Sequence, residues 1–234
     1  MDILKEKLGK YTGGKILDVA TGDGYFINLL INNLQNYLSV VGVDTDREIL
    51  EQSGKTFKNS RVSFEYMSGD DIKFDDNSFD TVAISNSLHH MKCIDKTLRE
   101  MYRVLKPGGN FIINEIICDN QNEKQLSHVY FHHLQAEIDT LMGICHNKTF
   151  AKNDVIKIAE NIGFIGYESF VHENKKFNQY VNIDMFKERY RNFVEKVKEC
   201  PEYEKYRLEF ESLAARLDNV GVEFASQLMI IGRK

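Results

Sequence analysis

The sequence predicts an α/β fold with a seven-stranded, mostly parallel sheet, helices on both of its faces, and helical insertions that form a lid. Two observations support this class. Short apolar runs alternate with amphipathic segments of about 10–15 residues, which is typical of strands joined by helices in a parallel sheet. The composition is that of a globular protein, because 42% of the 234 residues are hydrophobic and 28% are charged.

The strand and helix pattern is clearest in the first half of the chain. Apolar runs predict five strands, at residues 15–20, 38–43, 62–66, 79–84 and 110–117. Helices are predicted at 25–34, 46–57 and 94–105. The last of these is expected to end at Lys106-Pro107-Gly108-Gly109, because proline and glycine cannot continue a helix.

The pattern changes after Cys118. Two helical segments, 119–150 and 174–219, interrupt the sheet, with a helix at 152–162 and strands at 164–171 and 221–232. Ligands of open parallel sheets bind beyond the carboxyl ends of the strands. We therefore expect the two segments to form a substrate lid there, although they could merely cover the sheet. Without repeats or a flexible linker, residues 1–234 are predicted to form a single domain.

Charge and targeting signals restrict the function classes. Thirty Lys and Arg residues against 35 Asp and Glu residues give a net charge of -5, which makes nucleic acid an unlikely main partner. The four cysteines have no paired spacing and indicate reduced thiols. The charged N-terminal residues lack a signal sequence, and no apolar run reaches the roughly 18–20 residues that cross a bilayer. We expect a cytoplasmic protein without a membrane span, either a monomer or a homodimer.

A nucleotide-type site is predicted after the first strand. Gly22 and Gly24 let the backbone approach a ligand, and the following helix offers free N–H groups to an anion. Asp18 could hold an ammonium group. Asp44 ends the second strand about 20 residues later, where an acid binds the two hydroxyls of a ribose. Asp44 could instead cap the next helix, but Asp46 is also available for that role.

The identity of the ribose ligand depends on a third glycine. Dinucleotide sites use G-x-G-x-x-G, and this chain has Ile27 at the last position. This weakens the case for NAD and favours S-adenosylmethionine, which carries a carboxylate and an ammonium group in place of a pyrophosphate.

Four stretches carry a family resemblance: ILDVATGDGYF (16–26), VVGVDTDREIL (40–50), FDDNSFDTVAISNSLHHM (74–91) and REMYRVLKPGGNFIINE (99–115). In order and spacing they resemble class I S-adenosylmethionine-dependent methyltransferases of the methyltransferase domain 11 type, which includes the ubiquinone/menaquinone methyltransferases. The resemblance is strong over residues 10–118 and weak over the last strand. It implies a Rossmann-like fold and methyl transfer from S-adenosylmethionine, with S-adenosylhomocysteine as the product.

The resemblance also implies which residues surround the cofactor. Asp18, Gly22 and Gly24 would lie around its methionine part, Asp44 at the ribose, and Ile49 on the adenine face. Asn86 would line the methionine side. Either Ser68 with the Gly69 backbone or Asp70 would meet adenine. The remaining candidates come from the same loops: Ala20, which replaces the usual first glycine, and Thr21, Phe26 and Thr45.

Histidines dominate the region expected to meet the acceptor. Six of the seven fall between residues 89 and 146. The candidates for general-base catalysis are His90, His132 and His133, and those for the substrate pocket are His128, Glu137 and His146. On a helix His128 and His132 share a face, as do His133 and Glu137. This set could bind a divalent metal ion, line the pocket without metal, or form a polar surface, and the residues alone leave these possibilities open.

The leading prediction is methyl transfer to a small-molecule acceptor by in-line displacement, with an O, S, N or C nucleophile. The motif Asn-Pro-Pro-Tyr for nucleic-acid amino groups is absent, and Asn86-Ser87-Leu88-His89 stands there instead. One alternative is a tRNA or protein methyltransferase, in which the helical insertions bind the macromolecule. Basic residues along the segment 174–207, including Lys175 and Lys176, support this alternative. The other is a cofactor-binding module without catalysis.

Overall fold

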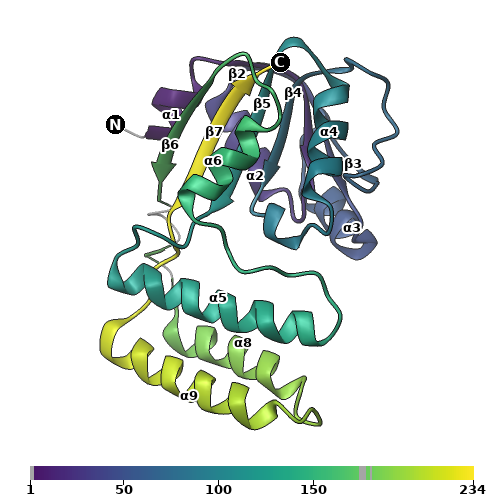
Figure 1. The fold of residues 1–234 in the computed structure, drawn as a ribbon. Coiled ribbons are helices and arrows are strands. Elements are labelled where there is room, and N and C mark those ends of the chain that lie inside the picture. The colour runs from purple at the N-terminus through teal and green to yellow at the C-terminus, as the bar shows by residue number, and fades with distance from the viewer. Residues whose placement is uncertain (1–2, 174–177, 180) are drawn as a thin grey trace.

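Seven strands form one sheet in the computed structural model, which describes residues 3–173, 178–179 and 181–234 (Figure 1). Their order across the sheet is β3-β2-β1-β4-β5-β7-β6. The strands are β1 (Thr12–Val19), β2 (Gln35–Asp44), β3 (Val62–Tyr66), β4 (Phe79–Ser85), β5 (Leu105–Ile116), β6 (Tyr167–His172) and β7 (Gln227–Arg233). The pairs among β1 to β5 are parallel, and β7 is antiparallel to both β5 and β6. The predicted seven-stranded, mostly parallel sheet is confirmed.

Helices cover both faces of the sheet because the strands are apolar on both sides. Neighbouring residues such as Ile16 and Leu17 are fully buried in different hydrophobic clusters, since side chains alternate between the faces of a strand. One face packs against α4 (Ile94–Val104) and α6 (Lys152–Glu160), and the other packs against α1 (Ile3–Leu8) and α2 (Tyr25–Asn33). A short 3-10 helix, η1 (Leu88–His90), follows β4, and α3 (Arg47–Thr56) follows β2.

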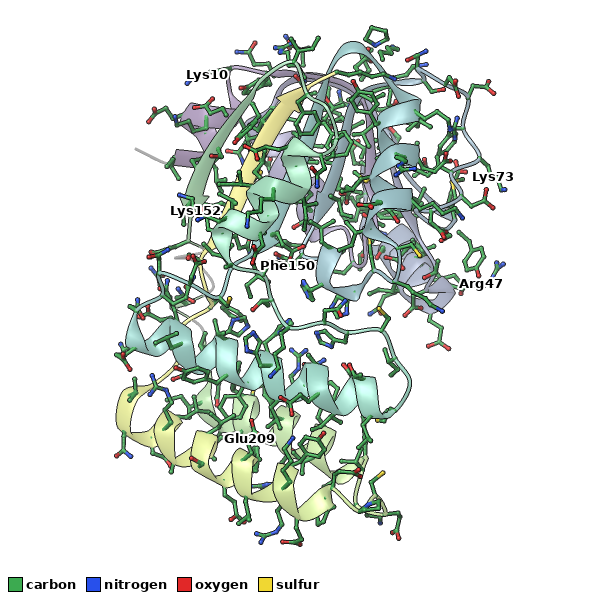
Figure 2. All side chains as sticks on the ribbon, in the orientation of Figure 1. Lys10, Arg47, Lys73, Phe150, Lys152 and Glu209 are labelled. Carbon is green, nitrogen blue, oxygen red and sulfur yellow. The ribbon has the colours of Figure 1, made fainter. Side chains whose placement is uncertain are left out.

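Three further helices form a separate layer beyond the carboxyl ends of the parallel strands (Figure 1). They are α5 (Glu123–Leu141), α8 (Ile183–Glu195) and α9 (Tyr203–Val220). This helical layer has its own hydrophobic core, in which Phe131, Tyr190 and Phe210 are buried. Phe150, labelled in Figure 2 at the junction of sheet and helices, forms a bridge with Ile117 at the end of β5. The layer lies where a lid was expected, and its role as a lid stays a prediction.

The element boundaries differ most where glycine and proline were interpreted as a turn. Residues Lys106-Pro107-Gly108-Gly109 belong to β5, not to a turn between helix and strand, and α4 ends before them. The pairing of β4 with β5 is irregular between Phe79 and Thr81, and Gly108 has a φ of 75°. The stretch therefore bends within a strand, as glycine in a strand often allows. The last strand begins at Gln227, six residues later than predicted from 221.

Among the helices of the described part of the chain, none combines the length and the apolar character that crossing a membrane requires.

Candidate active site

A cleft of about 500 Å³ opens at the carboxyl ends of β1 and β2 and beside the loops that follow β3 and β4. Its position matches the topological switch point, because the chain leaves β1 toward β2 and later returns to β4 on the other side. Eight residues that the sequence singled out line it: Ala20, Gly22, Asp44, Thr45, Ser68, Gly69, Asp70 and His90. Residues from four separate loops thus come together at one edge of the sheet.

Asp44 lies at the centre of this arrangement. One carboxylate oxygen accepts a hydrogen bond from the Gly22 N–H at 2.9 Å. The other accepts from the N–H groups of Thr45 at 2.7 Å and Asp46 at 3.0 Å. Asp46, not Asp44, caps α3, because its carboxylate accepts from the N–H groups of Glu48 and Ile49. Asp44 is therefore fixed between two loops and faces the cleft.

Two buried acceptors at the ends of adjacent parallel strands have no hydrogen-bond partner among the residues that the structure describes. Asp18 near the end of β1 is 1% exposed; its Oδ2 accepts from the Thr21 hydroxyl at 2.7 Å, while Oδ1 accepts no hydrogen bond. Burial, opposed by the Thr21 hydrogen bond and reinforced by the charge of Asp44, raises the pKa of Asp18 to about 7. Asn86 directly follows β4 with a φ of 47°, and its Oδ1 is also buried and unpaired. Buried acceptors normally find donors, so this pair fits a ligand ammonium group.

The loop after β3 supplies another wall of the cleft. The Ser68 hydroxyl donates to Asp70 at 2.6 Å, and Asp70 also pairs with Lys96 at 3.2 Å. The hydrogen bond from Ser68 is the largest cause of the lowered pKa of Asp70. A Cβ at Gly69 would lie 2.7 Å from Val19 Cγ1, so only glycine lets this loop lie against the sheet. Both candidates for the adenine site, Ser68 and Asp70, line the cleft.

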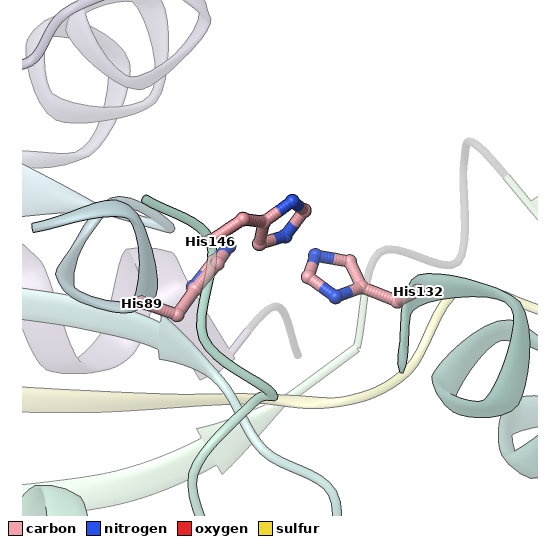
Figure 3. Close-up of side chains that lie close together, drawn as sticks. All are labelled: His89, His132 and His146. Carbon is pink, nitrogen blue, oxygen red and sulfur yellow. The ribbon is translucent and has the colours of Figure 1, made fainter. Parts of the chain in front are cut away.

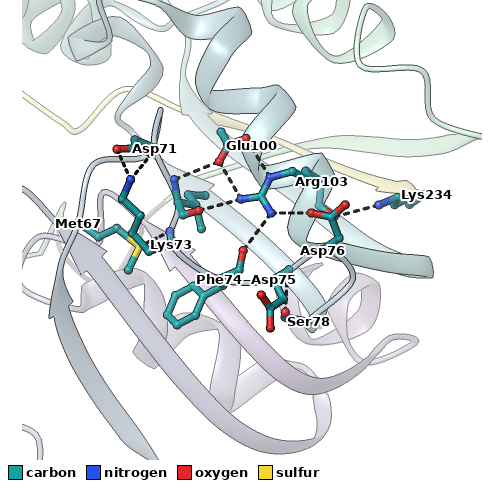
Figure 4. A network of polar contacts seen from close by, with 11 residues as sticks. Met67, Asp71, Lys73, Phe74, Asp75, Asp76, Ser78, Glu100, Arg103 and Lys234 are labelled. Carbon is teal, nitrogen blue, oxygen red and sulfur yellow. Dashed lines mark hydrogen bonds and ion pairs between the residues drawn. The ribbon is translucent and has the colours of Figure 1, made fainter.

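A single arginine holds the continuation of this loop (Figure 4). Arg103 on α4 donates to the carbonyls of Ile72 at 2.7 Å and Phe74 at 2.9 Å and to Asp76 at 2.7 Å. It also forms two hydrogen bonds with Glu100, which in turn accepts from the Ile72 N–H. The network lowers the pKa of Glu100, chiefly through the hydrogen bond from Arg103. It fixes the loop that carries Ser68 and Asp70 to α4.

Asp18, Asn86 and the remaining cofactor candidates lie outside the lining of this cleft. Phe26 is buried in the core against the sheet, at 3% exposure. Thr21 is buried and bonded to Asp18. Ile49 lines a second hollow between α2 and α3. Gly24 has a φ of 78° and begins α2, and a Cβ there would lie 2.6 Å from Phe57, so its role in the structure is packing and turn geometry.

Ala20 occupies the position where the resembled family has its first glycine. Its φ of 55° lies in the left-handed region, which costs a residue with a Cβ about 1 kcal/mol. The backbone conformation that explains the usual glycine is thus kept, and Ala20 still lines the cleft.

Three of the seven histidines form a cluster, and the other four lie beside it or apart from it. His89, His132 and His146 each present a ring nitrogen to the same point, with these atoms within 4.8 Å of one another. His90 lies beside them, its ring centroid 4.3 Å from that of His89 and 4.1 Å from that of His146. The pKa of His90 is lowered, chiefly because part of the ring is removed from water and then because of the charges of the neighbouring His89 and His146. The residue as a whole is exposed at the cleft.

The other acceptor-site candidates point elsewhere. The His133 ring is hydrogen-bonded to the Thr149 hydroxyl at 2.8 Å, and it is not one of the three clustered histidines. His128 Nδ1 accepts from the Ala225 N–H at 3.2 Å. Glu137 forms ion pairs with Lys148 at 2.7 Å and Lys205 at 2.9 Å, on the side of α5 toward α9. None of the three lines the cleft.

The sequence interpretation counted His89 among the six neighbouring histidines but gave it no site role, and it missed Glu115. Glu115 is fully buried in β5 and its Oε1 lies 2.7 Å from His89 Nδ1. A signal for it existed, because a carboxylate inside the apolar strand 110–117 needs a buried partner. The residues that line the cleft next to His90 also include Ser87, Lys92 and Cys93, for which the sequence gave no distinct signal.

Comparisons with known proteins find matches over part of the chain. Residues 17–113 match the family model described as a methyltransferase domain. The chain is 35% identical over 131 residues to the ubiquinone/menaquinone biosynthesis C-methyltransferase UbiE of Geobacter sp. (strain M21), a match that covers 54% of this chain and 56% of that protein. The chain thus spans about half the length of the curated relatives it matches.

Solved structures share the fold over nearly the whole chain. An S-adenosylmethionine dependent methyltransferase from Mesorhizobium loti has a TM-score of 0.58 at 16% identity, covering 99% of this chain and 96% of that chain. A phosphoethanolamine N-methyltransferase 2 from Haemonchus contortus, in complex with S-adenosyl-L-methionine, has a TM-score of 0.58 at 21% identity, covering 99% of this chain and 51% of that chain.

Proposed function

Residues 17–113 match a methyltransferase domain, and from this premise we propose that the protein is a class I S-adenosylmethionine-dependent methyltransferase that transfers the methyl group of S-adenosylmethionine to a small-molecule acceptor. The observation that carries the proposal is the cleft in which Asp44 faces the loops after β1 and β3. When bound there, the sulfonium supplies an electrophilic methyl group for in-line displacement.

Residues in the cleft and beside it would bind different parts of the cofactor. Asp44 would accept hydrogen bonds from the ribose hydroxyls, as an acid at the end of the second strand does. The unpaired oxygens of Asp18 and Asn86 would take the ammonium group. Ser68, Gly69 and Asp70 would border the adenine. Alignment of the two reactants is the main contribution that such a protein makes to the rate.

The acceptor would lie between the cleft and the helical layer. His90 lines the cleft and touches the rings of His89 and His146, so it connects the two regions. The relatives are named for ubiquinone and menaquinone biosynthesis, and hydroxylated aromatic rings of this kind are therefore the first acceptors to test. The nucleophilic atom, whether O, S, N or C, is left to that test.

A tRNA or protein acceptor has weaker support. Several cations of the basic segment are paired: Lys187 with Asp218, Lys205 with Glu137, and Arg207 with Glu204 and Glu211. Paired cations contribute little to phosphate binding. Lys175 and Lys176 lie outside the described residues.

Calorimetry with S-adenosylmethionine and S-adenosylhomocysteine tests the proposal, with Asp44→Ala and Asp46→Ala as a matched pair. Asp44→Ala should bind the cofactor about 10- to 100-fold more weakly, because the charged hydrogen bonds to the ribose hydroxyls are lost. Asp46→Ala removes only the cap of α3, worth about 0.5–2 kcal/mol of stability, and should keep the affinity. Absence of binding to the wild-type protein would refute the proposal. Binding without turnover on any acceptor would favour a cofactor-binding module.

A further inference from the structure

Three histidines from separate parts of the chain lie close together (Figure 3). His89 comes from η1, His132 from α5, and His146 from the loop between α5 and α6. One ring nitrogen of each lies within 4.8 Å of the others. Within the described ranges, this is the group of histidine, cysteine and acidic side chains whose ligand atoms come close enough to hold one metal ion.

Two of the three rings are oriented by buried carboxylates. His89 Nδ1 lies 2.7 Å from Glu115 Oε1, and His146 Nδ1 lies 2.7 Å from Asp139 Oδ2. Glu115 is itself held by the N–H groups of Leu88 at 2.9 Å and Ile116 at 3.1 Å. When Nδ1 donates to a carboxylate, Nε2 keeps its lone pair, which is how metal-binding histidines are usually arranged.

Two ring nitrogens of the cluster have no hydrogen-bond partner among the described residues. They are His146 Nε2 and His132 Nδ1, and both are buried. Each of these histidines therefore has a buried ring nitrogen that can serve as a metal ligand.

The charges around the cluster also favour a cation. Glu115 is completely buried and Asp139 is 7% exposed. Buried carboxylates need a compensating positive charge or a full set of hydrogen bonds. A divalent ion among the three rings would balance both.

We propose that His89, His132 and His146 bind one divalent metal ion of the zinc class through their ring nitrogens. Zinc–nitrogen bonds of about 2.0–2.1 Å place tetrahedral ligands about 3.3 Å apart, so small rotations of the rings would complete the site. Three protein ligands leave a fourth position, as catalytic zinc sites do. His90 borders both the cluster and the cleft, which puts this position beside the methyl-transfer site.

The open position would take a hydroxyl, thiol or amine of the acceptor. A bound metal ion lowers the pKa of such a group and so favours its deprotonated, nucleophilic form. The proton would pass to solvent, and the acceptor atom would then form the new bond to the methyl carbon as the carbon–sulfur bond breaks. This role in catalysis rests on the proposed function, whereas metal binding by the three histidines does not.

Metal titration of the full chain, first stripped with a chelator, tests the site. Calorimetry should show one high-affinity equivalent of Zn²⁺, and Co²⁺ should give the visible bands of a site with nitrogen ligands. His132→Ala should weaken binding at least 100-fold. His133→Ala is the matched control, because it is adjacent on α5 but bonded to Thr149, and it should bind like the wild type. Circular dichroism would check that both variants are folded.

Other outcomes would overturn the site. Equal metal binding by His132→Ala and His133→Ala, or no binding by the folded wild type, would leave the cluster as a set of ion pairs. A thiolate charge-transfer band with Co²⁺ that disappears in Cys145→Ser would assign the metal to that exposed cysteine. If His132→Ala does not fold, Asp139→Asn should weaken binding about 10- to 100-fold through the orientation of His146. Cofactor calorimetry on the same samples separates the two proposals. A protein that binds the cofactor but binds no metal ion would refute only the metal site.

Discussion

The cofactor cleft and the histidine cluster adjoin each other, yet they are built in different ways. The cleft is made by loops that directly follow strands, and backbone N–H groups such as those of Gly22 and Thr45 hold Asp44 in place there. The cluster is made by side chains from η1, α5 and a loop that meet only in the folded protein. The first kind of site is tied to the sheet, and the second depends on how the helical layer is placed against it.

This difference predicts that the two regions fail separately. The sheet and the helical layer have distinct hydrophobic cores, joined by a small cluster around Ile116, Val129 and Ala225. Variants can therefore be chosen that damage one region and leave the function of the other measurable.

The largest effect is expected from Phe131→Ala. Phe131 is fully buried in the helical layer, with ring centroids 4.7 Å from Tyr190 and 5.3 Å from Phe186. The cavity should cost about 3–5 kcal/mol of unfolding free energy, measured by chemical denaturation. The control is Tyr130→Ala, because the neighbouring Tyr130 is 40% exposed and its ring contacts the Arg216 guanidinium. Loss of that cation–π contact should lower the unfolding free energy by about 1 kcal/mol or less. If Phe131→Ala also abolished cofactor binding, the cleft would depend on the helical layer.

Glu115→Gln should act on the cluster alone. The amide keeps the size of the side chain but removes the charge that orients His89. Loss of such a partner typically weakens metal binding about 10- to 100-fold, which zinc competition with a chelating dye would measure. Cofactor affinity should stay at the wild-type value. Unchanged metal binding would show that Glu115 has only a structural role in β5.

The pH dependence of cofactor binding should come from the cleft. Burial raises the pKa of Asp18 to about 7 in the free protein, and an ammonium group beside Oδ1 would lower it, because opposite charges favour ionisation. Binding then releases a proton, so affinity should rise on the order of five- to tenfold from pH 6 to 7.5. Calorimetry in buffers of different ionisation enthalpy would measure the proton. Asp18→Asn should remove the slope, and an equally steep slope in that variant would contradict the assignment.

The smallest effect is expected from Glu137→Gln. The ion pairs of Glu137 with Lys148 and Lys205 are partly exposed, and such pairs contribute about 0–1 kcal/mol. Thermal unfolding should therefore change little, and turnover should not change. A large loss of turnover with intact stability would place Glu137 in the substrate pocket, as the sequence predicts.

Much of the fold could be predicted from the sequence because its signals are local. Buried strands are continuous apolar runs, and the turn after β1 has glycine at positions with positive φ. The cleft residues after β1 and β2 followed from these elements and from the order of parallel strands. The error at Lys106–Gly109 has the same origin, since proline and glycine disrupt pairing whether they end an element or bend one.

The grouping of the histidines could not be predicted in the same way. Helical spacing placed His128 with His132 and His133 with Glu137, and spacing describes only one helix surface. In the structure the rings of His128 and His132 are in contact, with centroids 6.2 Å apart, as the helical spacing predicted. The contacts of His132 with His89 and His146, and of His133 with Thr149, involve other segments and could not be predicted from one helix.

The sequence by itself determined the order of strands and helices, the turn after β1 and the acid at the end of β2, because hydrophobic periodicity and glycine conformations act over a few residues. Only the tertiary structure decided which histidines meet and which carboxylates orient them. Those contacts depend on how α5 and the loop before Phe150 pack against the ends of β4 and β5, and packing between distant segments leaves no periodic trace in the chain.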